Sequence, residues 1–236
     1  MSNRIYLYED DIGYVELVDH MGSDLTIVNS ARVSFGKHKE ELDEKDKKLI
    51  GYLVKHKHTS TFEHNVATFR FCVPLFVRGQ HMRHRTWSYN EISRRYTEEN
   101  IQFYQPSAFR TQHKSNRQAS NPEDLINPII DPWNASGGAG ASYLVSSHNK
   151  KSMLLYQKLI ENGICREQAR GVLPQNMYTE YYGTVNLNNL LKFITLRTHA
   201  GAQWEIQKLA QATLQIAEGL WPVAVSSFIK SREIKK

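Results

Sequence analysis

Cysteine is nearly absent from this chain, which has only Cys72 and Cys165 in 236 residues. Two cysteines far apart in the sequence do not make the disulfide framework of a small secreted protein, so a reducing compartment is expected. No apolar run approaches the ~20 residues that a membrane span needs, and the first residues lack the apolar stretch of a secretion signal. These absences predict a soluble cytoplasmic protein with no membrane partner.

The chain carries only a small excess of positive charge. Its 30 lysines and arginines outnumber 24 aspartates and glutamates, which gives a formal charge of +6. Such an excess favours anionic ligands, but it does not distinguish a nucleotide from a nucleic acid or a membrane surface. Charged residues make up 23% and hydrophobic residues 40% of the chain, a composition that is typical of globular proteins and excludes wholesale disorder.

Apolar periodicity predicts a mixed α/β (α+β) fold. Strands are expected at 66–73, where apolar and polar residues alternate, and at 178–185. Helices are expected at 43–57, which Asp43 can cap, and at 74–82, 149–161, 166–173, 187–198 and 202–220, the last of which stops at Trp221-Pro222. Residues 12–35 have the character of short strands and turns. Residues 111–148 are rich in Ser, Asn, Pro and Gly and are interpreted as a long surface loop with one or two short elements. We therefore expect a single domain over 1–236 with a loop insertion at about 111–148.

Residues 83–96 form the most informative segment of the sequence. Four arginines, one histidine, two serines and one glutamate are among its fourteen residues. Arginine suits bidentate recognition of phosphate and carboxylate. Hydrogen bonds to a charged group are worth ~1.5–3 kcal/mol each, whereas a surface ion pair is worth about 0–1 kcal/mol. This clustering therefore favours a multiply charged ligand, and Trp87, Tyr89 and Tyr96 offer ring faces for a planar group.

The same segment has a simpler interpretation as a basic surface loop that binds RNA or DNA. Asn90 and Glu91 count mildly against this interpretation, because a grip on phosphates that ignores sequence gains nothing from a carboxylate. A titration with labelled oligonucleotide at two salt concentrations would separate the two hypotheses.

Two other local patterns have weaker support. A zinc site is conceivable at His56, His58, Glu63 and His64, but the spacing is loose and no cysteine lies nearby, so no metal is expected. Ser93 lacks the surroundings of a nucleophilic serine.

The arginine-rich segment carries a known pattern. Arg83-His84-Arg85 followed by Ser93 resembles the R-H-R-x7-S signature of the flavin-dependent thymidylate synthases, and the flanking Ser88–Glu91 and Arg95-Tyr96 resemble the same family. Further segments resemble the family in the same order, namely Ala31–Phe35, Phe62–His64, Val172–Pro174 and Gln203–Ile206. The resemblance covers most of the chain outside the first dozen residues, 111–148 and the C-terminal tail.

The resemblance implies an enzyme of de novo dTMP biosynthesis. Such an enzyme transfers the methylene of methylenetetrahydrofolate to dUMP and reduces it with a hydride from FADH2, which NADPH regenerates. It works without a cysteine nucleophile. The resemblance also implies the family's mixed α/β fold, with a twisted sheet flanked by long helices, and a homotetramer with shared active sites. No nucleic acid partner is expected.

The resemblance assigns site residues by motif. Arg197 is the catalytic residue that activates the uracil. The residues expected to bind dUMP are Gln80, Arg83, Glu91, Ser93, Arg94, Arg95, Arg170 and Arg197. The residues expected to bind FAD are His58, Ser60, Arg83, His84, Arg85, Glu91, Asn186, Asn188 and Lys192. Lys192 departs from the family, in which Asn or His is expected. On its own residue evidence, Asn186 is equally well explained as a helix cap.

Overall fold

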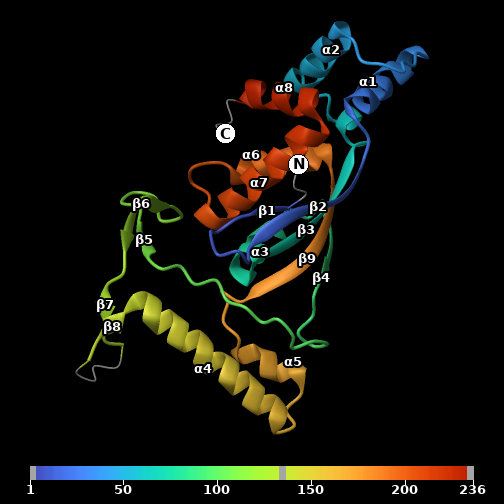
Figure 1. Ribbon diagram of the computed structural model, residues 1–236. Helices are drawn as coiled ribbons and strands as arrows, with labels where there is room; N and C mark the ends of the chain where they lie inside the picture. The colour runs from blue at the N-terminus through green and yellow to red at the C-terminus, as the bar shows by residue number, and fades with distance from the viewer. Residues whose placement is uncertain (1–3, 133–136, 233–236) are drawn as a thin grey trace. The chain divides into compact units, whose positions relative to one another are not determined.

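The computed structural model describes residues 4–132 and 137–232 (Figure 1). The chain divides into two compact units. Unit 1 comprises Met1–Cys72, Gln80–Asn90 and Tyr181–Lys236, and unit 2 comprises Val73–Gly79 and Glu91–Glu180. The mixed α/β fold class is confirmed, while the expectation of one catalytic domain over the whole chain stays a prediction.

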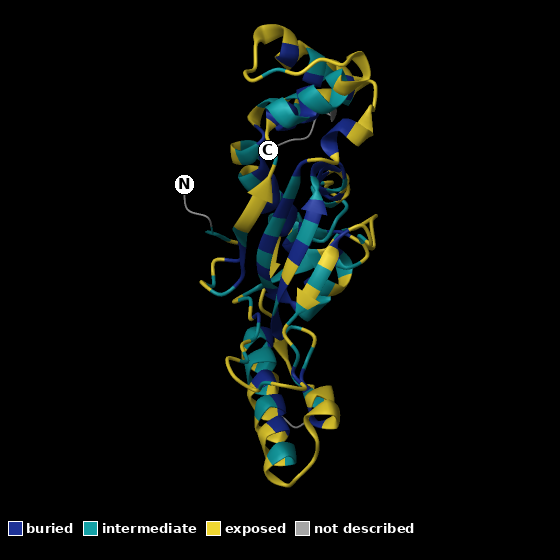
Figure 2. Cartoon of the chain, turned by 90° about the vertical axis from the view of Figure 1, so that its right-hand side faces the viewer, coloured by how far each residue is buried: buried dark blue, intermediate teal, exposed yellow. Residues whose placement is uncertain are grey.

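A five-stranded sheet runs in the order β1-β2-β3-β9-β4. Its strands are β1 (Arg4–Tyr6), β2 (Tyr14–Met21), β3 (Val66–Pro74), β9 (Tyr178–Asn186) and β4 (Ser88–Glu91). Strand β2 pairs antiparallel with both β1 and β3. The alternation predicted for β3 is confirmed, because every second residue from Ala67 to Val73 is buried, and Figure 2 shows this banding along the central strands.

The helices of unit 1 are α1 (Asp24–Arg32), α2 (Glu44–Lys55), α6 (Leu187–Arg197), α7 (Trp204–Leu220) and α8 (Pro222–Arg232), with single 3-10 turns at η1 (Val33–Phe35) and η2 (Thr59–Phe62). Helix α7 packs against β2, α6 and α8. The predicted caps of two helices are confirmed: Asp43 accepts hydrogen bonds from backbone N–H groups at the start of α2, and Asn186 does so at the start of α6.

One expectation in unit 1 is wrong. Residues 24–32 belong to the region expected to form short strands and turns, but they form α1.

The predicted stop of the helix at 202–220 is confirmed, because α7 ends at Leu220. Pro222 then begins α8, since proline is tolerated in the first turn, where its missing N–H has no partner to lose. The next two N–H groups, of Val223 and Ala224, donate to the buried carboxylate of Asp24 at 2.9 Å each.

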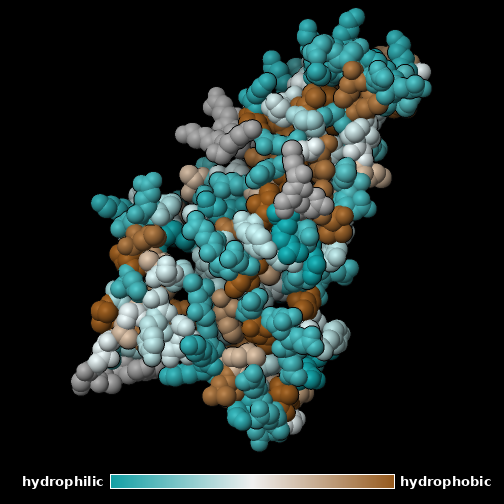
Figure 3. Space-filling model, viewed as in Figure 1, coloured by the Kyte–Doolittle hydropathy of each residue, from teal (hydrophilic) through white to brown (hydrophobic). Residues whose placement is uncertain are grey.

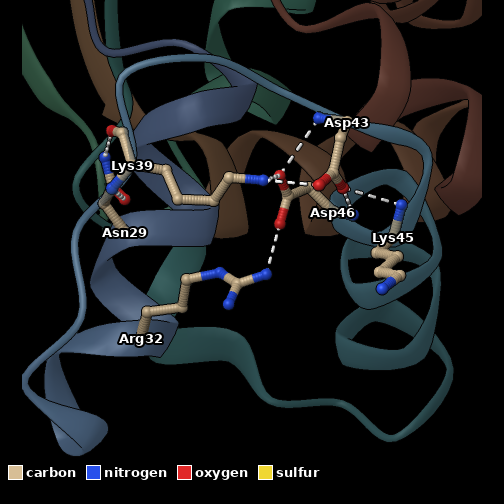
Figure 4. A network of polar contacts seen from close by, with 6 residues as sticks. All are labelled: Asn29, Arg32, Lys39, Asp43, Lys45 and Asp46. Atoms are coloured by element: carbon tan, nitrogen blue, oxygen red, sulfur yellow. Dashed lines mark hydrogen bonds and ion pairs between the residues drawn. The ribbon is translucent and has the colours of Figure 1, made fainter.

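A polar network joins α1, α2 and the connection between them (Figure 4). Asn29 exchanges two hydrogen bonds of 2.9 Å with the backbone of Lys39. The ammonium of Lys39 contacts Asp43 at 2.7 Å and Asp46 at 2.5 Å. Arg32 binds the other carboxylate oxygen of Asp46, whose side chain is fully buried. Asp46 therefore ties both sides of the α1–α2 connection together.

The segment 111–148 contains more regular structure than the one or two short elements expected of it. In unit 2, β5 (Phe109–Gln112) pairs antiparallel with β6 (Ser120–Ile126), and β7 (Ile129–Ile130) pairs with β8 (Ala139–Gly140). Residues 133–136 of the predicted loop lie outside the described residues. Strands β6 and β7 carry exposed apolar side chains, and brown patches are visible in this region at the left of Figure 3. These residues are Leu125, Ile126, Ile129 and Ile130.

Helix α4 (Ala141–Glu161) begins eight residues before the predicted helix at 149–161, whose C-terminal end is confirmed. Its buried face includes the polar Asn149 and Ser152, which weakens the apolar periodicity on which a sequence-based prediction relies. Tyr156 on this face packs in the core of unit 2 with Ala169, at the end of α5 (Arg166–Ala169), and with Leu173 and Met177, which follow η3 (Arg170–Val172). No helix within 4–132 or 137–232 has both the length and the apolar character that crossing a membrane requires.

Candidate active site

The predicted catalytic arginine sits at the C-terminal end of α6. The apolar stripe of α6 is buried. The helix is therefore held rigidly, and the backbone of Arg197 has a fixed position. The Arg197 Nε–H donates to Nε2 of His84 at 3.0 Å, and its Nη2 donates to the carbonyl of Gln80 at 3.2 Å. The structure thus brings together three residues that the sequence assigned to the site.

His84 is neutral in this arrangement. Its Nε2 accepts from Arg197, so the ring proton resides on Nδ1. Burial, and then the positive charge of Arg197, lower the pKa of His84 to about 4. A neutral imidazole orients the guanidinium without repelling it, and Arg197 keeps the site's positive charge even though burial lowers its own pKa.

The turn that carries these acceptors is anchored in a buried aromatic cluster. His81 is fully buried, and its Nδ1 lies 2.8 Å from the Tyr181 hydroxyl. Its ring centroid is 4.5 Å from that of Trp87 and 4.7 Å from that of Phe193. The Tyr89 hydroxyl hydrogen-bonds to two backbone carbonyls of the turn.

Sequence reasoning missed His81 as a site residue and considered Tyr89 only as a ring face. The available signal for His81 was its position three residues before His84, the spacing of one helical turn.

A cavity in unit 1 collects three predicted FAD residues. His58, Asn188 and Lys192 line it, together with apolar residues of α2, η2, α6 and α8. Its volume is about 210 Å³, which is below the roughly 300–1,000 Å³ of a typical ligand site. The cavity can therefore receive one part of a large cofactor rather than the whole. Asn188 is oriented here by donating to a carboxylate oxygen of Glu63 at 2.8 Å.

Other predicted FAD residues of unit 1 lie outside the lining of this cavity. Ser60 is an exposed residue of η2. The side-chain oxygen of Asn186 accepts a hydrogen bond from the N–H of Asn189 at 2.9 Å, so the role that the structure shows for Asn186 is that of a helix cap. Arg83 and Arg85 are exposed, and neither pairs with a carboxylate among the residues that the structure describes. Two unneutralised guanidinium groups on one short turn suit an anion.

Unit 2 carries the remaining predicted residues, beginning with Glu91. Its Oε1 accepts from the Arg78 guanidinium at 2.9 Å and from the Thr179 hydroxyl at 2.7 Å. These two protein partners fix the carboxylate in place. Sequence reasoning missed both partners, because each is distant from Glu91 in the chain.

Arg94 is a buried cation without a carboxylate partner among the residues that the structure describes. The residue is 7% exposed, and its Nη1 donates to the carbonyl of Glu99 at 2.6 Å. Its Nε has no hydrogen-bond partner within the same described ranges. Burial lowers the pKa of Arg94, since the charged form is desolvated. A buried guanidinium that no carboxylate neutralises is costly unless an anion binds there.

Two ion pairs lie beside the predicted phosphate-binding residues of unit 2. Arg95 lies 3.8 Å from a carboxylate oxygen of Glu167, and Arg166 lies 3.3 Å from one of Glu98. Both pairs connect the segment after β4 to α5. Arg170, exposed at the start of η3, directly follows that helix. Ser93 precedes Arg94 on the same segment, and its hydroxyl accepts from a backbone N–H at 3.3 Å.

Three further candidates concern cysteine, metal and histidine chemistry. Cys72 is partly buried and Cys165 is exposed, and the two are not joined in a disulfide. Across the described ranges, no group of three or more His, Cys, Asp or Glu side chains is arranged to hold a metal ion. His199 accepts a backbone N–H from Gly201 at 3.0 Å and so stabilises a turn.

Comparisons with known proteins give a consistent result. The sequence model of a family described as "Thymidylate synthase complementing protein" matches residues 16–223. A flavin-dependent thymidylate synthase of Thermus thermophilus is 43% identical over 218 residues, which cover 92% of this chain and 76% of the relative. One of Thermotoga neapolitana is 42% identical over 220 residues, which cover 93% of this chain and 92% of the relative.

A solved structure is also similar. It is that of a UMP/dUMP methylase, PolB, from Streptomyces cacaoi, bound with 5-Br dUMP. The TM-score is 0.77 and the identity is 32%, with 98% of this chain and 100% of that chain covered.

Proposed function

This chain belongs to the flavin-dependent thymidylate synthase family, and from that premise we propose how its own residues perform the reaction. The substrates are dUMP and methylenetetrahydrofolate, and the products are dTMP and tetrahydrofolate. NADPH is the reductant that regenerates the reduced flavin. The observation that carries the proposal is the fixed Arg197 guanidinium, which donates to the His84 ring and to the Gln80 carbonyl.

The residues present fit a flavin dinucleotide. Arg83 and Arg85 supply exposed guanidinium groups for its two phosphates, and His84 lies between them. The cavity lined by His58, Asn188 and Lys192 has room for one ring of the cofactor. When bound, FAD supplies the hydride that completes the methyl group. Ser60, Glu91 and Asn186 complete the proposed set of FAD residues.

Arg197 acts on the uracil ring. Its positive charge stabilises the negative charge that develops on the pyrimidine when C5 becomes nucleophilic, and one preorganised donor of this kind is worth roughly 3–4 kcal/mol. His84 and the Gln80 carbonyl hold the guanidinium before substrate arrives, so no reorganisation is needed during the reaction. The proposed reaction requires no attack by a cysteine on the uracil.

The phosphate of dUMP is bound by the segment after β4. Ser93, Arg94 and Arg95 supply a hydroxyl and two guanidinium groups, and Arg170 adds a third guanidinium. The unneutralised charge of buried Arg94 supports this assignment, because a phosphate dianion would offset its desolvation. Gln80, Arg83 and Glu91 complete the proposed dUMP residues. A homotetramer with shared active sites and a cytoplasmic location also belong to the proposal.

The purified protein provides the test. It should be yellow, dUMP should perturb the flavin spectrum, and dTMP should form when methylenetetrahydrofolate and NADPH are added. Deoxyuridine, which lacks the phosphate, is the matched control and should leave the spectrum nearly unchanged. A colourless protein that takes up no added FAD would contradict the proposal, and tight, salt-sensitive oligonucleotide binding that is indifferent to dUMP would favour a nucleic-acid-binding role instead.

A further inference from the structure

Both acceptors of Arg197 belong to one short turn, residues 80–84. The Nε–H donates to the His84 ring and Nη2 donates to the Gln80 carbonyl. An arginine side chain has many rotatable bonds, so its head group is fixed only as well as the groups that accept its hydrogen bonds. The geometry of the 80–84 turn therefore determines where the Arg197 guanidinium points.

The side-chain hydroxyl of Tyr89 hydrogen-bonds to two backbone carbonyls of this turn. The Tyr89 hydroxyl lies 3.1 Å from the carbonyl oxygen of His81 and 3.3 Å from that of His84. A phenol has one proton, so it donates to both carbonyls in a shared hydrogen bond. The turn's own backbone adds one bond of 3.0 Å, from the His84 N–H to the His81 carbonyl, and one of 3.4 Å, from the Arg83 N–H to the Gln80 carbonyl.

The position of the Tyr89 hydroxyl is itself fixed by packing. The Tyr89 ring lies parallel to the Trp87 ring, with an interplanar angle of 4° and centroids 6.1 Å apart. It meets the Tyr181 ring edge-on at 6.0 Å and the His81 ring edge-on at 5.4 Å. Its surroundings are apolar enough that burial raises the pKa of the phenol. The hydroxyl stays protonated and remains a donor.

We infer that Tyr89 is a positioning residue for Arg197, because its hydroxyl locks the turn that carries both acceptors of the guanidinium. The inference rests on the proposed function only for the statement that Arg197 acts on the uracil. The locking of the turn depends on contacts of the protein alone.

The pKa of the His84 ring is a measure of whether this turn keeps its position. The charged and titratable groups that influence it are Arg197 on α6 and His81 at the end of α3 (Leu75–His81). Burial and the Arg197 charge hold the pKa of His84 at about 4, and burial holds that of His81 well below its usual value. If the turn loosens, His84 moves into water and away from Arg197, so its pKa returns toward 6.5.

The test is Tyr89→Phe, which removes the hydroxyl and keeps the packed ring. NMR titration of the His84 ring, in protein with and without FAD, should show its pKa rising by at least about one unit. In the assay for dTMP, kcat should fall about tenfold while KM for dUMP changes less than about twofold. The matched control is Tyr182→Phe, because Tyr182 is exposed on β9 and its hydroxyl has no hydrogen bond within the described residues. The control should match wild type.

A double-mutant cycle with Arg197→Lys distinguishes positioning from general destabilisation. If Tyr89 acts through Arg197, the losses in kcat should not multiply, and the double variant should resemble Arg197→Lys alone. An unchanged His84 pKa together with wild-type kcat in Tyr89→Phe would overturn the inference and leave the proposed function intact. If wild-type protein forms no dTMP but Tyr89→Phe still shifts the His84 pKa, the proposed function is contradicted. The inference that Tyr89 holds the 80–84 turn is then retained.

Discussion

Replacing Asp46 with asparagine should destabilise unit 1 more than any change on its surface. The carboxylate is fully buried and binds two cations, Arg32 and Lys39, as well as the N–H of Asp43 (Figure 4). The substituted amide would keep the shape and one acceptor, but it would lose the charge that both cations face. Asp46→Asn therefore isolates the electrostatic part of the network.

The expected loss in the free energy of unfolding depends on the two cations that remain without a carboxylate. Breaking a buried ion pair from one side typically costs about 3–5 kcal/mol, because an uncompensated charge remains in the interior. Here the side chains of Arg32 and Lys39 are 26% and 28% exposed, so each can turn toward water and part of that cost is recovered. We expect a loss of about 2–3 kcal/mol in the free energy of unfolding, which corresponds to a decrease of roughly 5–10 °C in Tm for a chain of this size.

The assay is thermal and urea unfolding of wild type, Asp46→Asn and the surface control Glu44→Gln. Glu44 pairs with Lys47 on the same helix, but its side chain is 79% exposed, so the control should shift Tm by no more than about 2 °C. Equal shifts in the two variants would refute the reasoning.

Acid provides a second check on Asp46. Burial alone would raise its pKa, but the hydrogen bonds from Lys39, the Asp43 N–H and Arg32 outweigh burial and hold it below 3.8. The stability that the carboxylate contributes is therefore present above about pH 4, where the unfolded group is ionised, and is lost as the pH falls through the lower folded value. The Asp46→Asn variant should lack this part of the acid sensitivity.

Four further predictions concern the site. Arg197→Ala should abolish dTMP formation while FAD stays bound, and loss of FAD by absorbance would reassign its role. Ser93→Ala should raise Kd for dUMP roughly tenfold yet leave turnover measurable, so a dead enzyme with normal dUMP affinity would revive the nucleophile hypothesis. The double variant Cys72→Ala and Cys165→Ala should still form dTMP, and loss of both activity and a covalent uracil adduct would contradict it. Neutral His84 should stabilise the fold fully above pH 6.5 and less as the pH falls toward 4; a denaturation profile that is flat in this window in wild type and His84→Gln alike would refute its buried neutral state.

Regular elements with strong local signals were predictable from the sequence. The alternation of β3 and the caps Asp43 and Asn186 are local properties, and each is confirmed. Helices α1 and α8 were missed because they depend on contacts with distant parts of the chain rather than on a local pattern, and α8 packs mainly against α2 and α7. Asp24 on α1 supplies the acceptor for the first free N–H groups of α8, and the residues around Pro222 carry no sign of that carboxylate.

Some residues of the candidate site were predictable from local patterns, but the contacts that hold them were not. The R-H-R-x7-S pattern led to the family, which is confirmed, and to residues that the structure brings together in part, such as His84 with Arg197. The supporting contacts were not predictable, because they join distant parts of the chain. Glu91 meets Thr179 across 88 residues, and His81 meets Tyr181 across 100. The individual binding roles assigned by motif stay predictions until ligands are measured.

The capping of α8 by Asp24 joins positions 199 and 200 residues apart, and the indole of Trp221 reaches back equally far to the carbonyl of Gly22 at 3.0 Å. During synthesis the N-terminal segment leaves the ribosome long before these partners exist, because a chain grows at about 5–20 residues per second. The carboxylate of Asp24 thus has no amide hydrogens of α8 to accept until translation is almost finished. Closure of unit 1 is consequently a late event, and a chain released before α8 is made would lack both amide donors of the Asp24 carboxylate.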